Sequence, residues 1–257
     1  MTTGRARGSG LGLALGWLLA LAAIVLFASL GRWQLARMHE KQARLDAAAQ
    51  ALDHAHPQPL LLASDSARAA AYDWAAGSGT VLDATLWLDN QMRAGRAGVR
   101  MYCVLLPDDG VQALLVDAGW WPLDGQRDLP VFGCPRGRGN AVRGLLAPPP
   151  SSGLQHGDAL AASGPRRWLA TRLELPALAR ALKLSTGIAP RVLRLDPERA
   201  NGDAGVMLAA GERDLDILPN TLTPQRHLGY AVQWFALAAT VLAVAVVLTL
   251  KSKRNEE

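Results

Sequence analysis

The sequence predicts a membrane protein in which two transmembrane α-helices flank one extracytoplasmic, β-rich α+β domain with mainly antiparallel strands. Two uncharged apolar runs, residues 11–30 and 229–250, lie near the two ends of the chain. At about 1.5 Å of rise per residue they form helices of roughly 30 and 33 Å, long enough to cross the apolar core of a bilayer. The mostly polar stretch between them contains several strand candidates, of which residues 80–88 alternate between apolar and polar side chains, as half-buried strands do.

The first run has a cleaved secretory signal as its alternative interpretation, because Arg5 and Arg7 precede it and small residues lie near its end. The apolar core of a signal is roughly 7 to 15 residues long, and this run is longer and continues without a small-x-small cleavage site. We therefore interpret residues 11–30 as a retained anchor. The second run, 229–250, has only three polar interruptions and is too long for a core helix, so it is a second span.

The two runs predict a tail at 1–10, a span at 11–30, a β-rich domain at 31–228, a span at 229–250 and a tail at 251–257. Positive residues close to the ends of spans stay in the cytoplasm, which places both tails there. The basic tail residues are Arg5, Arg7, Lys251, Lys253 and Arg254. Opposing this orientation, Arg32, Arg37, Lys41 and Arg44 follow the first span, but they belong to a large domain that translocates regardless of charge.

The charge distribution argues against nucleic acid as a partner, although the sequence pI is near 9.7. Residues 31–228 hold 22 basic and 20 acidic residues, so most of the positive excess lies in the tails. The domain shows no basic stripe with interleaved aromatic residues, the pattern that grips single strands. Membrane lipid is the only polyanion that the tails need to meet. Arginine outnumbers lysine by 23 to 4, a bias that coding composition explains as readily as a ligand does.

Within the domain, residues 33–52 are rich in helix formers and predict a helix that Pro57 and Pro59 end. Residues 80–88 alternate as a strand, with Asp89–Asn90 as the turn that follows. Residues 99–106 and 111–116 predict a hairpin across the turn-forming residues 107–110. Further expected elements are strands at 140–146, 191–195 and 206–210 and a short helix at 175–184 with Pro176 in its first turn.

The sequence contains few motifs that are typical of catalytic sites or of bound metal ions. The chain has no Gly-rich phosphate loop, no Gly-x-Ser-x-Gly turn and no His-Glu-x-x-His pair, and no nucleophile with a base to support a hydrolase. His54 and His56 lack further ligands nearby and suit a solvated loop, as does His156. Cys103 and Cys134 are not at metal-site spacing. Because Cys103 falls on a predicted strand, a disulfide and a buried free thiol explain the pair equally well. We interpret the cysteines as unpaired, since the sequence does not establish the short Cα separation that a disulfide needs.

The most informative group of residues lies where the second span begins. On a helix, His227, Tyr230, Ala231, Trp234 and Ala238 share one face, with the imidazole toward water and two aromatic rings below it. A haem needs an axial nitrogen, aromatic or apolar walls and room for a flat ring, and Arg226 is placed to pair with a propionate. The alternative interpretation is an interfacial aromatic belt.

On the first span, Trp33 and Gln34 are expected at the same membrane depth as His227. Gly12 and Gly16 form a small-x-x-x-small pair that predicts close contact between the two spans.

Three motifs in the right order make the chain resemble the surfeit locus protein 1 family, the Surf/Shy assembly factors of cytochrome c oxidase. They are Gly31-Arg32-Trp33-Gln34-Leu35-Ala36-Arg37 with Lys41, Val116-Asp117-Ala118-Gly119-Trp120-Trp121-Pro122, and His227-Leu228-Gly229-Tyr230-Ala231-Val232-Gln233-Trp234-Phe235. A looser match runs from Leu88 through Gly95 and Gly98 to Pro107. Ala118 stands where the family often has arginine, so any role of that charge does not carry over.

The resemblance implies a multi-pass protein of the cell inner membrane with a periplasmic domain, and a non-enzymatic role in cytochrome c oxidase assembly. It implies haem a as a transient cofactor, bound through the iron by His227 and surrounded by Tyr230, Trp234, Arg226, Trp33 and Gln34. The expected partners are oxidase subunits, above all the largest one, with haem a synthase as a further candidate. The alternative is a scaffold that steadies a nascent oxidase subunit and binds no haem. Gly119 and Trp120 are expected to be structural.

Overall fold

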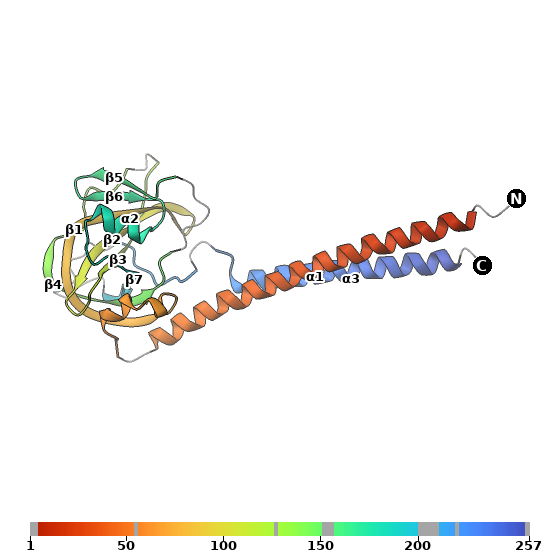
Figure 1. The fold of residues 1–257 in the computed structure, drawn as a ribbon, viewed down its shortest axis with the longest axis horizontal. Helices are drawn as coiled ribbons and strands as arrows, with labels where there is room; N and C mark the ends of the chain where they lie inside the picture. Colours follow the sequence, from red (N-terminus) through yellow and green to blue (C-terminus); the bar gives the residue numbers. More distant parts are fainter. Residues whose placement is uncertain are drawn as a thin grey trace. The chain divides into compact units, whose positions relative to one another are not determined.

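The computed structural model describes residues 5–53, 56–125, 128–150, 157–199, 211–218 and 221–254. The chain forms two compact units, one built from the helical segments near its two ends and the other from residues 45–220. Two long apolar helices flank a mixed β-sheet domain (Figure 1). The predicted fold class is therefore confirmed.

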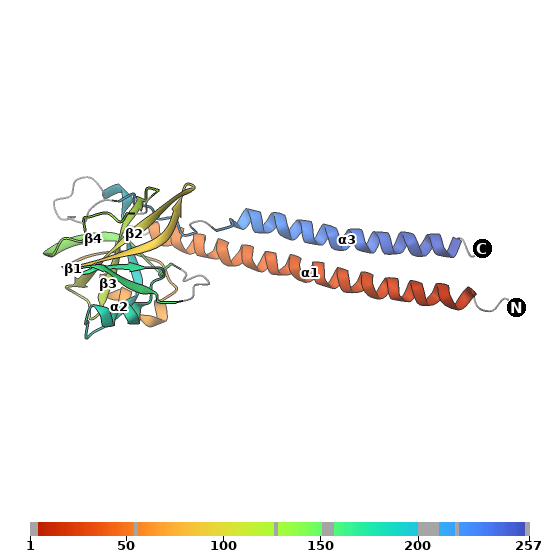
Figure 2. The ribbon, with the colours of Figure 1, turned by 90° about the horizontal axis from the view of Figure 1, so that it is seen from above.

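The two long helices are α1, Arg5–Leu52, and α3, Pro224–Arg254, and each contains a stretch long and apolar enough to cross a membrane. The helix predicted at 33–52 is confirmed, and it is continuous with the first apolar run. With 48 residues, α1 is about 72 Å long, far more than the apolar core of a bilayer needs. Figures 1 and 2 show α1 and α3 running side by side in opposite directions, with the start of α1 and the end of α3 together.

The domain is built on a closed ring of strands. Seven strands form one sheet in the order β2-β3-β7-β4-β1-β6-β5, and an additional pairing of β1 with β2 closes the first five into the ring. Antiparallel pairs predominate, as predicted, and the parallel pairs are β3 with β7 and β1 with β6. The strands are β1 Asp73–Arg93, β2 Arg96–Pro107, β3 Ala113–Pro122, β4 Gly137–Ala147, β5 Leu160–Gly164, β6 Arg167–Ala170 and β7 Ile188–Leu195.

The length of β1 makes the closure possible. One of its edges pairs with β2 along most of the strand. On the other edge, the first half pairs with β4, from Asp73 to Val81, and the second half pairs with β6, from Thr85 to Leu88. Because a closed ring leaves few unpaired backbone groups, this arrangement also protects the sheet from edge-to-edge association.

The turn predicted at Asp89–Asn90 is wrong. β1 continues to Arg93, and the hairpin turn to β2 lies at Ala94 and Gly95, which both have positive φ. Asn90 does adopt a left-handed φ of 56°, but it does so within a bulge of the strand. Asparagine tolerates that conformation in bulges as well as in turns, so its presence alone does not locate the turn.

The remaining predicted elements are largely confirmed. The hairpin of 99–106 and 111–116 corresponds to β2 and β3, in which Leu105 lies opposite Leu114. The strands expected at 140–146 and 191–195 lie within β4 and β7, and α2, Leu175–Ala181, has Pro in its first turn. The strand expected at 206–210 lies outside the described residues. β5 and β6 were not predicted, because Leu160–Gly164 is mostly small and exposed residues with no alternation.

The core follows the alternation of the strands. One cluster of buried side chains draws on all five strands of the ring, and the short 3₁₀ helix η1, Leu60–Ser64, packs Leu60 against it. A second cluster lies on the opposite sheet face and includes Leu178 of α2 and Ala170 of β6. The last turns of α1 join the domain through Ala48 and Ala51, which pack against Leu145 of β4. The other short helices are η2, Ser66–Arg68, and η3, Pro197–Arg199.

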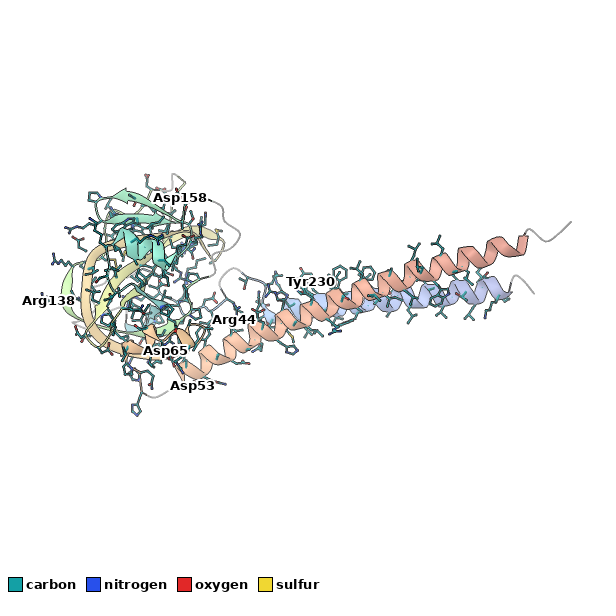
Figure 3. The ribbon with its side chains drawn as sticks, in the orientation of Figure 1. Arg44, Asp53, Asp65, Arg138, Asp158 and Tyr230 are labelled. Carbon is teal, nitrogen blue, oxygen red and sulfur yellow. A yellow bond between two sulfur atoms is a disulfide. The ribbon has the colours of Figure 1, made fainter. Side chains whose placement is uncertain are left out.

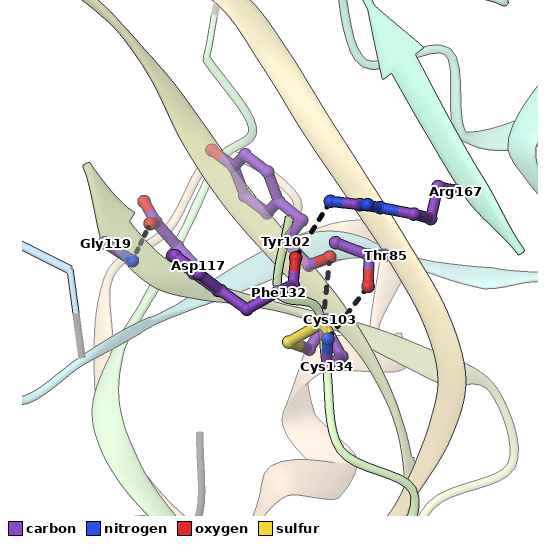
Figure 4. The surroundings of a disulfide bond; sticks show 8 residues. All are labelled: Thr85, Tyr102, Cys103, Asp117, Gly119, Phe132, Cys134 and Arg167. Carbon is purple, nitrogen blue, oxygen red and sulfur yellow. Dashed lines mark hydrogen bonds between the residues drawn. A yellow bond between two sulfur atoms is a disulfide. The ribbon is translucent and has the colours of Figure 1, made fainter. Parts of the chain in front are cut away.

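The two cysteines are paired, which corrects the prediction of free thiols. Cys103 of β2 and Cys134 form a disulfide whose Cα atoms are 5.6 Å apart. The loop that carries Cys134 folds back onto the sheet, where the backbone N–H of Cys134 donates to Oγ1 of Thr85 (Figure 4). Arg167 holds the same loop by donating to the backbone carbonyl of Phe132 (Figure 4). Loop and strand thus meet through long-range contacts that the spacing of the cysteines does not reveal.

The disulfide predicts a marked loss of domain stability when it is removed. It closes a loop of 31 residues, and the chain-entropy model assigns such a crosslink about 3 to 4 kcal/mol. Replacing both cysteines by serine is expected to lower the free energy of unfolding of the full-length protein in detergent by about that amount, measured by urea titration with tryptophan fluorescence. Dithiothreitol serves as the control, since it should weaken the wild type and leave the double variant unchanged. Equal stability of the oxidised wild type and the double variant would contradict the prediction.

Candidate functional site

The two membrane-length helices touch along their length in an antiparallel register. Nε1 of Trp17 donates to Oγ1 of Thr249, 2.9 Å away, and farther along the pair the rings of Phe27 and Trp234 lie 5.6 Å apart. Beyond the apolar stretch, the ammonium group of Lys41 donates to the backbone carbonyl of Leu222. Residues with higher numbers on α1 contact residues with lower numbers on α3. The three contacts therefore fit a single antiparallel packing of the two helices.

Gly31 makes a close contact between the two helices, and Gly12 and Gly16 do not. A Cβ added to Gly31 would lie 2.8 Å from the ring of Phe235, which is closer than real Cβ contacts come. A Cβ added to Gly12 or Gly16 would meet nothing within 4 Å. The prediction that the Gly12–Gly16 pair brings the spans together is therefore wrong. Both motifs contain small residues, but only Gly31 lies opposite a bulky ring.

One helical turn after Gly31, the structure joins two of the predicted site residues. Nδ1 of His227 lies 2.6 Å from Oε1 of Gln34. Because an amide oxygen only accepts hydrogen bonds, Nδ1 carries the proton, and the lone pair of the neutral imidazole is therefore on Nε2. His227 is 6% exposed, and within the described part of the chain its Nε2 has no hydrogen-bond partner.

The other predicted site residues surround this pair more loosely. Trp33 and Tyr230 are 52% and 41% exposed, and Figure 3 shows Tyr230 on the helix pair. Trp234 is half-buried against Phe27, a residue that the sequence did not single out. Arg226 is exposed, and its guanidinium makes no ion pair with any residue that the structure describes. The predicted face of α3 is thus split, with His227, Ala231 and Ala238 buried and Tyr230 outside.

Of the three histidines assigned to solvated loops from the sequence, His56 lies among the described residues. His54 and His156 lie outside the described residues, and His56 is exposed just after α1. Among the described residues, no group of three histidine, cysteine, aspartate or glutamate side chains is arranged to hold a metal ion.

The motif in the middle of the chain, 116–122, fixes the segment 211–218 to the domain. Trp120 exchanges two backbone hydrogen bonds with Glu212, and the backbone N–H of Gly211 donates to the carbonyl of Ala118. Gly119 has φ = +122°, and a Cβ on it would lie 2.9 Å from the backbone of Gly211. Any side chain at Gly119 would therefore push the segment away, so this glycine is structural, as expected.

Buried charges hold the same segment. The Arg100 guanidinium donates to Asp117 at 2.9 Å and to Asp214 at 2.6 Å, and Arg194 donates to Asp214 at 2.6 Å. Burial opposes ionisation of Asp214, but the charges of Arg100 and Arg194 outweigh it and keep the pKa of this carboxyl below its ordinary value. Sequence reasoning missed this network, because its members come from β2, β3, β7 and the segment before α3.

The chain has two helices that can cross a membrane and one ring-shaped β domain between them in the sequence. A buried histidine of one helix contacts the other helix near the end of the apolar stretch. These features define a two-span membrane protein. The model of the SURF1 family matches residues 21–239, which is well over half of the chain. The chain therefore belongs to the SURF1 family, which is known as a family of oxidase assembly factors, and the resemblance seen in its motifs is confirmed. No curated protein matches this chain.

The helix contact at Gly31 predicts different effects for the same substitution at two positions. Gly31→Leu is expected to destabilise the helix pair by about 1 to 3 kcal/mol, because the new side chain overlaps the Phe235 ring. Gly16→Leu is the matched control and should be close to neutral. The measurement is the resistance of the full-length protein in detergent to unfolding by added sodium dodecyl sulfate. Phe235→Ala should rescue Gly31→Leu, and equal effects at both glycines would contradict the assignment.

The carboxyl of Asp214 predicts a pH-dependent contribution to stability. A carboxyl whose pKa is lowered in the folded state stabilises the fold above its unfolded pKa, and this contribution disappears as the pH falls through the folded value. We expect Asp214→Asn to lower the free energy of unfolding at pH 7 by about 3 kcal/mol, because it leaves buried guanidinium groups with less compensation. The loss of stability between about pH 5 and pH 2 should be smaller in the variant than in the wild type.

Asp158 provides the control for this experiment, since it is an exposed carboxylate of the same domain (Figure 3). Urea unfolding of Asp158→Asn should follow the wild type at every pH. An Asp214→Asn variant that is as stable as Asp158→Asn at pH 7 would rule out the charge network as a stabilising element.

Proposed function

We propose that this protein binds haem a between its two spans, where Nε2 of His227 would hold the iron, and aids its insertion into the largest subunit of cytochrome c oxidase. The observation that carries the proposal is the state of His227. Its Nε2 is buried and has no partner in the described part of the chain, while its Nδ1 is engaged by Gln34. A buried polar atom without a partner destabilises a protein by about 1 to 3 kcal/mol, and a ligand that pairs with it removes that penalty.

The residues present fit a haem in their donor chemistry. When bound, haem iron supplies a coordination position that takes a neutral imidazole nitrogen. Metal-bound histidines commonly donate their other ring N–H to an acceptor that fixes the tautomer and the ring orientation, and Gln34 supplies that acceptor. Nε2 is covered by protein atoms, so side chains over it have to move aside before a ring reaches it.

Nearby side chains suit the rest of such a ligand. Trp33 and Tyr230 are exposed aromatic residues next to the histidine–glutamine pair and are available to pack on a flat ring. Arg226 follows the same helix end and is available for a propionate. The function proposed is positioning and transfer of the cofactor, with no catalysed reaction.

We also propose that both tails are cytoplasmic and that the β domain lies in the periplasm, as a multi-pass protein of the cell inner membrane. The basic residues in the two terminal tails, next to the apolar runs, support this orientation. The disulfide between Cys103 and Cys134 supports it independently, because such bonds persist in oxidising compartments.

A scaffold that binds oxidase subunits without haem is the second candidate. The exposure of Trp33 and Tyr230 favours it, since aromatic side chains at headgroup depth anchor helices in the absence of any ligand.

The haem content of the purified full-length protein distinguishes the two candidates. From cells that make haem a, the wild type is expected to carry a haem absorbance band that is lost in His227→Ala. Gln34→Leu, which removes the acceptor for Nδ1, is expected to weaken haem binding by about 10- to 100-fold. His39→Ala is the control, because His39 is an exposed histidine on α1, the helix that carries Gln34. Wild-type haem content in His227→Ala would refute the ligand assignment, and a wild type without haem that still captures oxidase subunits would favour the scaffold.

A further inference from the structure

We propose that a pocket on the β domain binds the phosphate group of a small molecule or of a lipid headgroup through Arg136, Arg138 and Arg166. The pocket has a volume of about 660 Å³, which is in the range of small-molecule sites. Its wall combines these arginines with Thr80, Leu82 and Leu106. The proposal concerns residues 45–220 alone and does not depend on haem binding.

Strand register explains why two of the arginines lie together. Gly137 of β4 is paired with Val81 of β1. Val81 is fully buried in the core, and side chains alternate between the two sheet faces, so the residues on either side of this pair face away from the core cluster. Arg136 and Arg138 therefore share a face with Thr80 and Leu82, and Figure 3 places Arg138 on the surface of the domain.

The third arginine comes from the turn between β5 and β6. The carbonyl of Arg166 accepts a hydrogen bond from the backbone N–H of Thr85, which fixes the turn beside β1. Its guanidinium forms an ion pair with Asp83, the one carboxylate of the pocket lining. Three guanidinium groups against one carboxylate leave the pocket with two formal positive charges.

Arg136 and Arg138 differ from most arginines of the domain. Within the described residues, neither makes a hydrogen bond or an ion pair through its guanidinium. Most of the other domain arginines have a carboxylate partner: Arg68, Arg93, Arg96, Arg100, Arg143, Arg166, Arg172, Arg191 and Arg194. Two adjacent cations without a counterion in a concave site are therefore the exception in this domain.

A buried amide lies on the core side of Gly137 and does not line the pocket. Nδ2 of Asn140 is buried and has no partner among the described residues, and it lies 3.1 Å from where a Cβ on Gly137 would be. Asn140 as a whole is 8% exposed. The charged donors that line the pocket are therefore the guanidinium groups of Arg136, Arg138 and Arg166.

This donor set favours phosphate over a carboxylate. A phosphate group carries about 1.5 to 2 negative charges and three acceptor oxygens, which matches two excess positive charges and several guanidinium groups. A carboxylate has one charge and two oxygens. Leu82 and Leu106 add apolar surface, so the molecule that bears the phosphate is expected to have an apolar portion.

Isothermal titration of the full-length protein in a non-ionic detergent tests the proposal. The probes are inorganic phosphate, dioctanoyl phosphatidic acid and succinate. The double variant Arg136→Gln/Arg138→Gln is expected to bind phosphate at least tenfold more weakly than the wild type, and binding to the wild type should weaken as salt is added. Arg180→Gln is the matched control, since Arg180 is an exposed arginine of α2 outside the pocket and makes no guanidinium contact with any described residue.

Comparison of the probes identifies the source of the phosphate. Equal affinities for inorganic phosphate and phosphatidic acid support a free phosphorylated molecule, and much tighter binding of phosphatidic acid supports a lipid headgroup. Binding of neither phosphate probe, tighter binding of succinate, or equal binding by the wild type and the double variant would each overturn the proposal. Far-ultraviolet circular dichroism and the melting temperature of the double variant establish that it is folded.

Discussion

A polar side chain buried at the end of an apolar helix pair has to find its partners within the protein, and this constraint governs the candidate site. The hydrogen bond between Gln34 and His227 satisfies one ring nitrogen and, by doing so, determines the state of the other. This contact orients the imidazole and leaves Nε2 without a partner in the described chain. A histidine that lacked this partner would rotate and exchange tautomers, and its Nε2 lone pair would be a much poorer ligand for a metal ion. The chemistry of the site therefore depends on α1 as much as on α3.

The domain secures its two connections to the helices by different physical means. At the first connection, Ala48 and Ala51 of α1 pack against Leu145, so small apolar surfaces fit closely without charge. At the second, the segment 211–218 is bound by backbone pairing with Trp120 and by the ion network around Asp214. The apolar contact is insensitive to pH, whereas the ionic contact weakens as the carboxyl becomes protonated. Both connections are anchored on the same closed ring of strands.

The parts of the fold that follow from local patterns could be predicted, and the parts that follow from long-range contacts could not. Apolar length identified the helices, and the turn residues between two strand candidates identified the β2–β3 hairpin. The pairing of Cys103 with Cys134 depends on a loop that returns to β2, and no local pattern encodes that return. The two added strands β5 and β6 are defined by pairing with β1, because their own residues carry little strand signal.

The candidate site shows the same division. The helical spacing of His227 and the depth of Gln34 were both readable from the sequence, and the structure brings these two side chains into contact. The sequence did not predict which glycine lies at the contact between the two helices. Gly12 and Gly16 form the more familiar motif, but Gly31 makes the contact, because what matters is the ring of Phe235 across from it. A sequence motif describes the surface of one helix, whereas the contact depends on the side chains of both helices.

Many arginines of this arginine-rich chain have a structural role in the domain. Arg191 is fully buried and donates to Asp73 and to the carbonyl of Leu62, a combination that a planar, always charged guanidinium tolerates better than an ammonium does. Burial opposes ionisation of Asp73, and hydrogen bonds from Arg191 and Arg68 outweigh it and lower the pKa of this carboxyl. The domain thus uses arginine to fix carboxylates within its structure. Some exposed arginines have no carboxylate partner in the described chain, and most of these lie outside any pocket. Arg136 and Arg138 also lack such a partner, but their position in a concave site points to an anion supplied from outside the chain.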